Sequence, residues 1–547
     1  MEKRNKYVLF VLLACTLVYG NSFFNDFAYD DHRFILEDVA IRDSSYIGSW
    51  FTQDVQGLYR PLRQVLYVVS YSLFGENAFG YHLQSLLLHM GNSLLVLGIG
   101  WLLMGSRKGL FAGLLFAVHP IHTGRVTNMT GGFDQLGILF LLGALYLYLL
   151  YSKQGKKTYL WSSLLVFVLG LLASEEAIVL FPLILLYDYC IRKNVRRKEY
   201  AWYLVISVAY LVLRFFILQI GARAEGYSPY IRFLAMDIAF VKYLWLLFVP
   251  FPLTVQRSIS LESLSLISPL IFSALVLHVL LLVWAIRSRH RFPTVSYGIM
   301  WFYVALLPMS QIVPIQTIMA ERYLYVASVG FCFAVVTLVY YLRKFVVDEG
   351  LQKKFASGVL WTVIILFSLL TIERNMDWRD DVTLWTDTIS VSPRSTLAYN
   401  NLGFAYDRIG QYEEAIPYYQ NAILIDSKNF RAYSNLGVAY IRLERYGVAV
   451  RALNQSIQLD PTYAKSHNFL SIAYQELGKP DEARDALLTA VSLDPLYYEA
   501  YNNLGILYAR YGEVEGARKA FLKALEISPS YEDAAYNLQI LEIEKPQ

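Results

Sequence analysis

The sequence is poor in charge and in cysteine. Charged residues make up 17% of its 547 residues, whereas a soluble domain ordinarily carries about 25%. The net charge of +4 is small and gives no indication of a nucleic-acid partner. The three cysteines, Cys15, Cys190 and Cys332, all fall within or at the ends of apolar segments. A disulfide framework is therefore not expected.

Long apolar runs fill the part of the chain before about residue 374. A membrane-spanning helix needs about 20 mostly apolar residues. Segments of this kind lie near 7–24, 80–104, 109–122, 133–151, 158–173, 174–190, 200–219, 266–286, 294–313, 322–342 and 355–372. We therefore predict about eleven crossings and a multi-pass membrane domain over residues 1–374.

The orientation follows from lysine and arginine, which favour the cytoplasmic side. With the N-terminus inside, the first basic clusters fall inside after every even crossing. The cluster at 287–291 stays inside only if residues 233–254 do not cross, so we interpret that stretch as a re-entrant or interfacial helix. This topology places the first large loop, 25–79, and the C-terminal region outside. Twelve crossings with a cytoplasmic C-terminal region remain the alternative.

The polar end of the chain repeats every 34 residues, which is the length of a tetratricopeptide repeat. The leucines that mark it are Leu402, Leu436, Leu470, Leu504 and Leu538. Prolines end most of the second helices, and small residues let the paired helices approach. We predict an all-α protein in which a tetratricopeptide solenoid over 375–547 follows the membrane domain. It comprises a lone second helix at 378–391, four full repeats and a capping helix at 532–545.

Asparagines precede most of these leucines. They are Asn401, Asn435, Asn503 and Asn537, with Phe469 breaking the series. An amide offers both a donor and an acceptor, which suits the backbone of an extended peptide. The row is therefore a candidate acceptor-binding surface. The alternative is that these asparagines bond between neighbouring repeats.

Two adjacent acids, Asp30 and Asp31, lie in the first outer loop, close to the membrane. Ionisable groups at membrane depth are costly and tend to be functional. One carboxylate of such a pair can act as a base while the other orients it or holds a cation. The alternative is that both are solvated loop acids that cap a helix.

A second outer loop carries His119 and His122, whose i, i+3 spacing is that of half a metal site. No carboxylate or cysteine at a fixed spacing completes it, so the sequence leaves a metal undecided. Glu321 and Arg322 open another apolar segment, where they can form an internal ion pair that anchors the helix end.

Several short motifs occur together in a characteristic order. They are YDD at 29–31, LYRPL at 58–62, HLQSLLLH at 82–89, HPIHT at 119–123, Asp134, SEE at 174–176 and AERYLYVASVGF at 320–331. With the repeats that follow, they resemble the GT-C-type membrane glycosyltransferases of the transmembrane-and-tetratricopeptide class. The eukaryotic relatives of that class are O-mannosyltransferases.

This resemblance implies a polyprenyl-phosphate-linked sugar as donor and a Ser or Thr hydroxyl as acceptor. Asp30 or Asp31 would be the general base, and the anomeric carbon would be inverted as the lipid phosphate leaves. Arg60 and Arg322 match the arginines that would meet the phosphate. The remaining donor-side positions are His119, His122, Asp134 and Glu176.

The chain also departs from the family pattern. Gly124 stands where the family usually has Glu, Gly131–Gly132 where it has Gly-Arg, and Glu175 where it has Lys. Cationic positions are therefore lost or moved, and Arg125 is a candidate to compensate for one of them. A different donor sugar or reduced activity would be the consequence.

The sequence thus predicts a membrane glycosyltransferase that modifies proteins on the extracytoplasmic side, with the repeats binding the acceptor. The compact array and plain ends favour a bacterial plasma membrane. Two alternatives stay open. One is a non-catalytic scaffold that recruits proteins through the repeats, and the other is a transferase that acts on a lipid or glycan.

Overall fold

The computed structural model describes residues 2–55, 57–192, 197–220, 228–257, 265, 268–315 and 317–543. The described part is helical and contains no strand, only one isolated bridge between Val55 and Leu58. The predicted all-α class is therefore confirmed. The chain forms two compact units, Met1–Leu384 and Trp385–Gln547.

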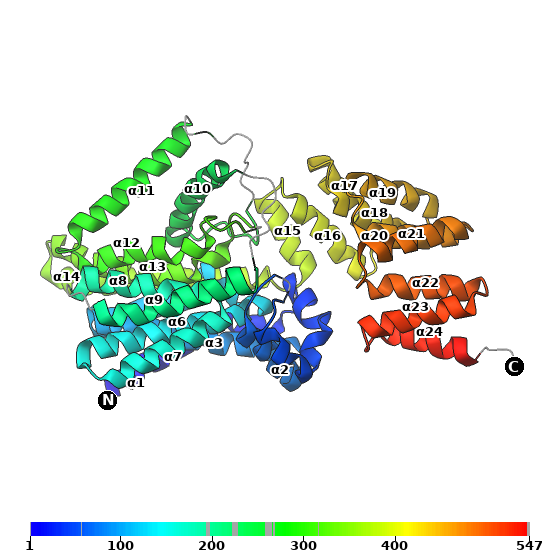
Figure 1. The fold of residues 1–547 in the computed structure, drawn as a ribbon. Helices are drawn as coiled ribbons and strands as arrows, with labels where there is room; N and C mark the ends of the chain where they lie inside the picture. Colours follow the sequence, from blue (N-terminus) through cyan, green and yellow to red (C-terminus); the bar gives the residue numbers. More distant parts are fainter. Residues whose placement is uncertain are drawn as a thin grey trace. The chain divides into compact units, whose positions relative to one another are not determined.

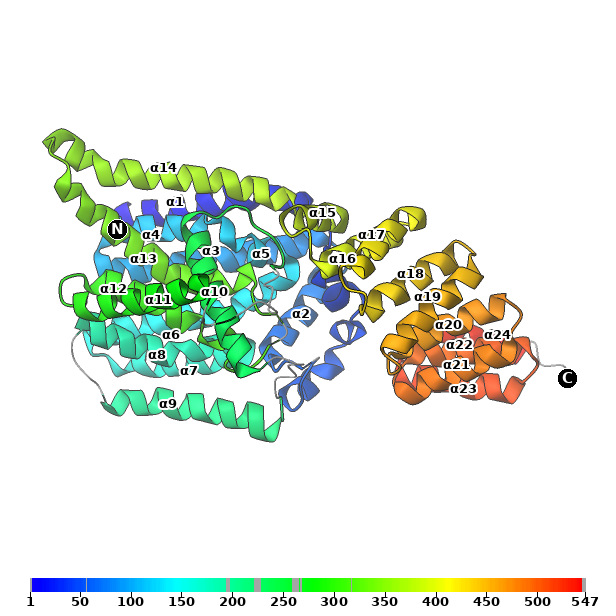
Figure 2. The same ribbon diagram turned by 90° about the horizontal axis from the view of Figure 1, so that it is seen from above.

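The described residues of the first unit form fourteen α-helices and several short helical turns (Figures 1 and 2). The α-helices are α1 (Glu2–Tyr19), α2 (Pro61–Phe74), α3 (Ala78–Met104), α4 (Ser106–Ala117), α5 (Thr123–Val126), α6 (Met129–Gln154), α7 (Lys157–Ala173), α8 (Leu180–Tyr187), α9 (Arg197–Val212), α10 (Pro229–Phe248), α11 (Pro269–Ser288), α12 (Pro293–Ala305), α13 (Leu324–Leu342) and α14 (Glu349–Met376).

Seven segments of the described residues are long and apolar enough to cross a membrane. They are Arg4–Phe24, Ala78–Met104, Met129–Gln154, Lys198–Ile217, Pro269–Ser288, Glu321–Phe345 and Lys354–Met376. The chain is thus a multi-pass membrane protein. Other predicted spans coincide with shorter helices, such as α4 with 12 residues and α12 with 13. The count of about eleven crossings stays a prediction.

The membrane unit has a continuous apolar core, in which α3 packs on α4 and α6, α6 on α7, and α12 on α13. Helices in lipid associate through small residues that let their backbones approach closely. Gly298 on α12 and Gly330 on α13 show this directly. A Cβ on Gly298 would lie 2.3 Å from the Gly330 carbonyl oxygen, and one on Gly330 would lie 2.6 Å from the Gly298 carbonyl oxygen.

The C-terminal unit is a series of helix pairs. Its helices are α15 (Asp381–Val391), which starts just before the unit, α16 (Thr396–Arg408), α17 (Tyr412–Ile425), α18 (Phe430–Arg442), α19 (Tyr446–Leu459), α20 (Ala464–Glu476), α21 (Pro480–Leu493), α22 (Tyr498–Arg510), α23 (Val514–Ile527) and α24 (Glu532–Ile543). The helix pairs α16–α17, α18–α19, α20–α21 and α22–α23 follow one another at intervals of 34 residues, and α24 comes after them. The lone helix begins at Asp381, not at 378, because Trp378 lies in the bend that follows α14.

The repeat signature has a packing cause. A Cβ on Gly403, Gly437 or Gly505 would lie 2.5–2.8 Å from the bulky side chain sixteen residues later on the partner helix. The alanine on that partner helix is fully buried in each repeat, as at Ala415 and Ala517. Helix pairs this close leave room only for a small residue at this position, which is glycine in three repeats and the buried Ser471 in the fourth.

Candidate active site

Asp31 is a structural acid. It is 1% exposed, and its carboxylate accepts the backbone N–H groups of Thr130 at 2.6 Å and Ala28 at 3.2 Å. Burial raises the pKa of Asp31 to about 6, against the effect of these hydrogen bonds. Both oxygens are thus used to fasten the loop after α1 to the start of α6.

Asp30 is placed differently from its neighbour. It is half-buried, and its carboxylate has no hydrogen bond or ion pair recorded with any described residue. Burial raises the pKa of Asp30, while the positive charges of Arg322, Arg63 and Arg33 oppose that rise. Of the two acids, Asp30 therefore offers the carboxylate that can receive a proton.

The loop that carries Asp30 is held in a strained conformation. Tyr29, directly before it, has a positive φ of 60°, which costs a non-glycine residue about 1–3 kcal/mol. Its backbone N–H donates to Asp381 Oδ1 at 2.7 Å, and His32 Nε2 lies 2.6 Å from Asp381 Oδ2. Asn375 adds a second anchor, since its carbonyl accepts from the Asn25 side chain at 2.8 Å. The loop is thus fastened to the end of α14 and to the start of α15.

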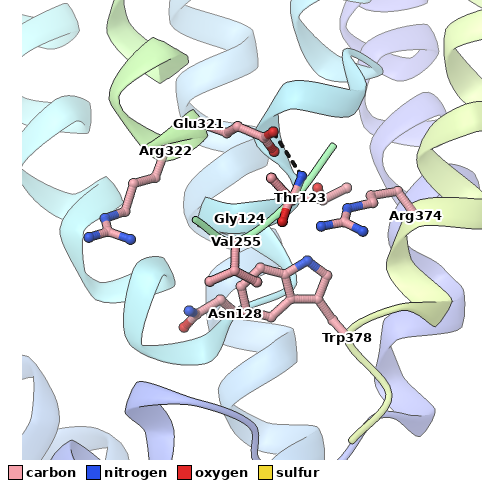
Figure 3. A pocket seen from close by; sticks show the side chains of 9 residues that line it. Thr123, Gly124, Asn128, Val255, Glu321, Arg322, Arg374 and Trp378 are labelled. Atoms are coloured by element: carbon pink, nitrogen blue, oxygen red, sulfur yellow. Dashed lines mark hydrogen bonds between the residues drawn. The ribbon is translucent and has the colours of Figure 1, made fainter. Parts of the chain in front are cut away.

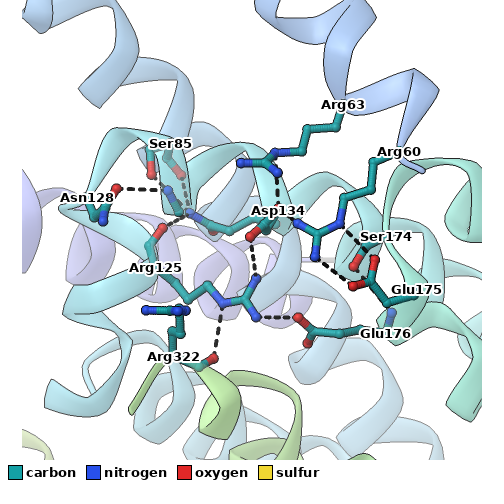
Figure 4. A network of polar contacts seen from close by, with 12 residues as sticks. Arg60, Arg63, Ser85, Arg125, Asn128, Asp134, Ser174, Glu175, Glu176 and Arg322 are labelled. Atoms are coloured by element: carbon teal, nitrogen blue, oxygen red, sulfur yellow. Dashed lines mark hydrogen bonds and ion pairs between the residues drawn. The ribbon is translucent and has the colours of Figure 1, made fainter. Parts of the chain in front are cut away.

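The membrane unit contains a buried network of arginines and carboxylates (Figure 4). Arg60 Nη1 donates to Asp134 at 2.6 Å, and its Nε and Nη2 donate to the two oxygens of Glu175, each at 2.8 Å. Arg125 pairs with Glu176 and lies 3.3 Å from Asp134. These side chains come from α5, α6 and the turns before α2 and α8, so the network joins four parts of the membrane unit.

Two further arginines complete the network. Arg63 Nε lies 3.2 Å from Asp134, and Arg214 Nη1 lies 3.6 Å from Glu175. Four guanidinium groups (Arg60, Arg63, Arg125 and Arg214) thus face three carboxylates (Asp134, Glu175 and Glu176), which leaves a net charge of +1. Arg60, predicted to meet a phosphate, is fully engaged in these pairs.

Arg322 is held by its backbone and leaves its side chain outside the network. Its carbonyl oxygen accepts from Arg125 Nε at 3.0 Å. Its guanidinium interacts with the Tyr29 hydroxyl and with the charge of Asp30. Glu321 does not pair with it: Glu321 Oε1 accepts from the Thr254 backbone N–H at 2.8 Å and from Arg257 Nε at 3.2 Å. The interpretation of Glu321 and Arg322 as an ion pair is therefore wrong. The positive charge of Arg322 instead acts on Asp30.

A pocket opens next to Arg322 (Figure 3). It is lined by Thr123, Gly124, Asn128, Thr254, Val255, Glu321, Arg322, Arg374 and Trp378. Arg322 lines the pocket, and its positive charge also acts on Asp30. Arg322 thus links the candidate base, Asp30, to the pocket.

The predicted histidines lie elsewhere. His119 and His122 are fully buried, and the HPIHT segment is a short helical turn (Pro120–His122), not an open loop. His119 Nε2 lies 3.0 Å from the Leu247 carbonyl, and His122 Nε2 lies 2.8 Å from Ser328 Oγ. No cluster of three or more potential metal ligands occurs in the described ranges. Asp134, expected in the same loop, is instead the sixth residue of α6.

Three asparagines of the repeat row bond between helices of successive repeats. Asn435 donates to Asn400 at 3.0 Å, Asn503 to Asn468 at 2.8 Å and Asn537 to Asn502 at 3.0 Å. Asn401 accepts only a long 3.5 Å contact from Asn400. The side-chain NH₂ groups of these three asparagines thus bond between neighbouring repeats, which is the alternative that the sequence left open. The side-chain oxygens of Asn435, Asn503 and Asn537 accept no hydrogen bond from the described residues of this unit.

Sequence reasoning missed several residues that the fold brings to the site. Asp381 and Trp378 look like ordinary members of the first repeat helix, and Thr254 and Arg374 belong to no motif. Arg214 is a lone arginine within a long apolar run. A charge in such a run is costly, and this was the only sequence feature that could have identified it.

The sequence comparisons agree with the order of motifs. Residues 61–218 match the family described as dolichyl-phosphate-mannose-protein mannosyltransferase, and 396–429, 430–463 and 470–532 match tetratricopeptide repeat families. The human protein O-mannosyl-transferase TMTC3 is 26% identical over 471 residues, which covers 76% of this chain and 51% of that protein. The chain is similar to the transmembrane-and-tetratricopeptide O-mannosyltransferases.

Other members of this group give similar values. Protein O-mannosyl-transferase F38B6.6 of Caenorhabditis elegans is 24% identical over 444 residues, covering 76% of this chain and 62% of that protein. Human TMTC4 is 25% identical over 484 residues, covering 75% and 64%. This chain spans about half the length of TMTC3. The predicted resemblance is confirmed.

Proposed function

We propose that this transmembrane-and-tetratricopeptide protein transfers a sugar from a polyprenyl-phosphate carrier to Ser or Thr hydroxyls of proteins. The observation that carries the proposal is the pairing of an unbonded carboxylate, Asp30, with an adjacent cation, Arg322. Its relatives are named protein O-mannosyl-transferases, and the match to the dolichyl-phosphate-mannose-protein mannosyltransferase family covers residues 61–218, which include Arg125 and Asp134.

The reaction follows from these two residues. Asp30 takes the proton of the acceptor hydroxyl as the oxygen attacks the anomeric carbon, and a base placed this way contributes about 10²–10⁴ in rate. The bond from the anomeric carbon to the phosphate oxygen breaks on the opposite face, so the configuration inverts. The carrier phosphate leaves with the electron pair, and Arg322 stabilises its charge. The step needs no cofactor beyond the lipid-linked sugar, and it leaves open whether a divalent metal assists.

The buried network gives this site its rigidity. Arg125 holds the Arg322 carbonyl while it pairs with Glu176 and Asp134, so the network fixes the backbone that carries the cation. In this proposal Arg60, Asp134 and Glu176 act by positioning and do not touch the donor. His119 and His122 are buried in the membrane unit and act there through their hydrogen bonds to Leu247 and Ser328.

The site belongs on the extracytoplasmic side. Lysine and arginine clusters in the chain fit a cytoplasmic N-terminus, which places the loop with Asp30 outside, in the bacterial periplasm or its equivalent. Tetratricopeptide repeats bind proteins, and we propose that Asn401, Asn435, Asn503 and Asn537 offer side-chain oxygens to the acceptor backbone.

Mass spectrometry of exported proteins tests the proposal. Cells that express the parent chain should carry hexose-modified Ser or Thr peptides that are absent from cells without it and from cells with Asp30→Asn. Glu37→Gln is the matched control, because Glu37 is an exposed acid of the same segment. Modification that persists with Asp30→Asn contradicts Asp30 as the base.

The two alternatives give different results. A non-catalytic scaffold would retain its protein partners in a pulldown with Asp30→Asn while no sugar is transferred even by the parent. A transferase that acts on a lipid or glycan would lose activity with Asp30→Asn but keep it when the repeat asparagines are replaced by alanine.

A further inference from the structure

Two buried polar groups in the pocket beside Arg322 lack a partner. Trp378 is 4% exposed and Thr254 is 1% exposed, and neither Trp378 Nε1 nor Thr254 Oγ1 has a hydrogen-bond partner among the described residues. Both residues line the pocket, and Figure 3 shows the indole nitrogen turned toward its interior. Buried donors are nearly always satisfied, so these two groups point to a ligand that supplies the missing partners.

Gly124 gives this pocket its room. A Cβ on Gly124 would meet only one atom within 4 Å, a ring carbon of Trp378 at 3.9 Å. The space next to the indole is therefore open at this position, and a longer side chain would grow into it. No positive φ accompanies Gly124, so the backbone itself accepts another residue there.

The lining has the chemistry of a site for hydroxyl groups. Trp378 supplies a donor and an apolar ring, Thr254 a hydroxyl that donates and accepts, and Glu321 a carboxylate. Arg322 and Arg374 also line the pocket, and Arg257 pairs with Glu321, so the choice between a sugar hydroxyl and a phosphate rests on the unpartnered Trp378 and Thr254 groups. The cation of Arg322, whose charge also acts on Asp30, lies where the carrier phosphate is expected.

We infer that this pocket holds the hydroxyl-bearing edge of the donor sugar, with Trp378 and Thr254 as its hydrogen-bond partners and Gly124 as the residue that leaves room for it. The inference rests on the proposed function and adds the residues that select the sugar. Arg322 then marks the border between sugar and phosphate, which places the anomeric carbon near Asp30.

Binding to the purified full-length chain tests this assignment without requiring transfer. The probes are polyprenyl phosphate, polyprenyl-phosphate mannose and polyprenyl-phosphate glucose. In the parent, one sugar-bearing carrier should bind more tightly than the bare carrier. Trp378→Phe and Thr254→Val should each lower that gain roughly tenfold, because one buried hydrogen bond to the sugar is lost. Affinity for the bare carrier should not change.

Matched substitutions control for general damage. Trp161→Phe changes an exposed tryptophan, and Gly358→Leu adds a side chain where no atom lies within 4 Å. Gly124→Leu should remove the preference between the two sugars, whereas Gly358→Leu should keep it. Thr254→Val retains the backbone N–H that Glu321 accepts, so it reports on the hydroxyl even if Gly124→Leu fails to fold.

Three results overturn the inference. The first is a parent that binds the sugar-bearing carriers no more tightly than polyprenyl phosphate. The second is a set of variants that weaken the binding of all three probes equally. The third is a preference for the sugar-bearing carrier that survives in both Trp378→Phe and Thr254→Val. Equal weakening of all probes would mean that the pocket takes the phosphate. A parent that binds the sugar selectively but never transfers it refutes the proposed function and leaves this subsite standing.

Discussion

Asp381 Oδ1 accepts the backbone N–H of Tyr29 at 2.7 Å, which links the start of α15 to the residue before the candidate base. The second carboxylate oxygen of Asp381 faces His32 Nε2 at 2.6 Å. Tyr29 has a positive φ, so one aspartate holds a strained turn from both sides of Asp30. The direction of the Asp30 carboxylate therefore depends on a residue 351 positions later in the sequence.

Replacing Asp381 should slow the chemical step. Asp381→Ala removes both acceptors and lets the turn relax, so we expect kcat to fall roughly 10–100-fold, the equivalent of one charged hydrogen bond. KM for the donor should change little, because Asp381 touches no donor atom in this account. Asp381→Asn keeps one acceptor and should be intermediate. Steady-state transfer assays measure both constants, with the exposed Glu373→Gln as control; a raised KM with unchanged kcat would contradict this role.

The pH profile should report Asp30 and its neighbour Arg322. A base works in its ionised form, and burial raises the pKa of Asp30 above its ordinary value of 3.8. Activity is therefore complete above that raised pKa and is lost as pH falls through it. This loss should occur at a higher pH than it would for an exposed aspartate. Because the Arg322 charge opposes the rise, Arg322→Gln should move the acid limb of kcat/KM to still higher pH, while Arg322→Lys should leave it near its place. An acid limb that does not move with Arg322→Gln speaks against their coupling.

Asp31 should affect stability more than chemistry. Its folded pKa of about 6 lies above the ordinary 3.8, so the protonated form favours the folded state. That contribution is complete below about pH 4 and is lost as pH rises through 6. Thermal unfolding of the detergent-solubilised chain should show this slope in the parent. In Asp31→Asn the slope between pH 4 and 6 should become shallower; a slope equal to that of the parent would assign the titration to other groups.

The Arg60–Glu175 pair should show strong coupling in the free energy of unfolding. Both side chains are largely buried, and removing one partner leaves a charge without its match, at a cost of about 3–5 kcal/mol. Arg60→Met and Glu175→Gln should each destabilise by this order, whereas the double variant should cost less than their sum. Denaturant unfolding of the three variants measures the cycle. Additive losses would mean that Arg214 or Asp134 compensates for the missing partner.

The repeat asparagines should matter for protein acceptors. Alanine at Asn435 and Asn503 removes the side-chain oxygens proposed for the acceptor backbone and two bonds between repeats. We expect KM for a protein acceptor to rise several-fold while binding of the lipid-linked donor is unchanged. Asn421→Ala, on the exposed face of α17, is the control. An unchanged acceptor KM would leave these asparagines with their structural bonds alone.

The sequence predicted what depends on local pattern. The helix pairs of the repeats recur every 34 residues, because a small residue and its large partner side chain recur at fixed spacing. The adjacent acids were recognisable, yet their difference was not, since it depends on Thr130, ninety-nine residues after Asp31. His119 and His122 looked like an exposed pair because polar residues interrupt an apolar stretch, whereas tertiary packing buries both. Contacts to Asp381, Trp378 and Thr254 arise only when distant segments fold together, and no spacing encodes them.

The most direct test of the account is the transfer rate of purified Asp30→Asn with polyprenyl-phosphate mannose and a Ser/Thr peptide acceptor. The account predicts a loss of about 10²–10⁴ in kcat, with donor affinity retained and with Asp31→Asn losing less activity whenever it folds. Asp30→Asn at the parental rate would contradict Asp30 as the base.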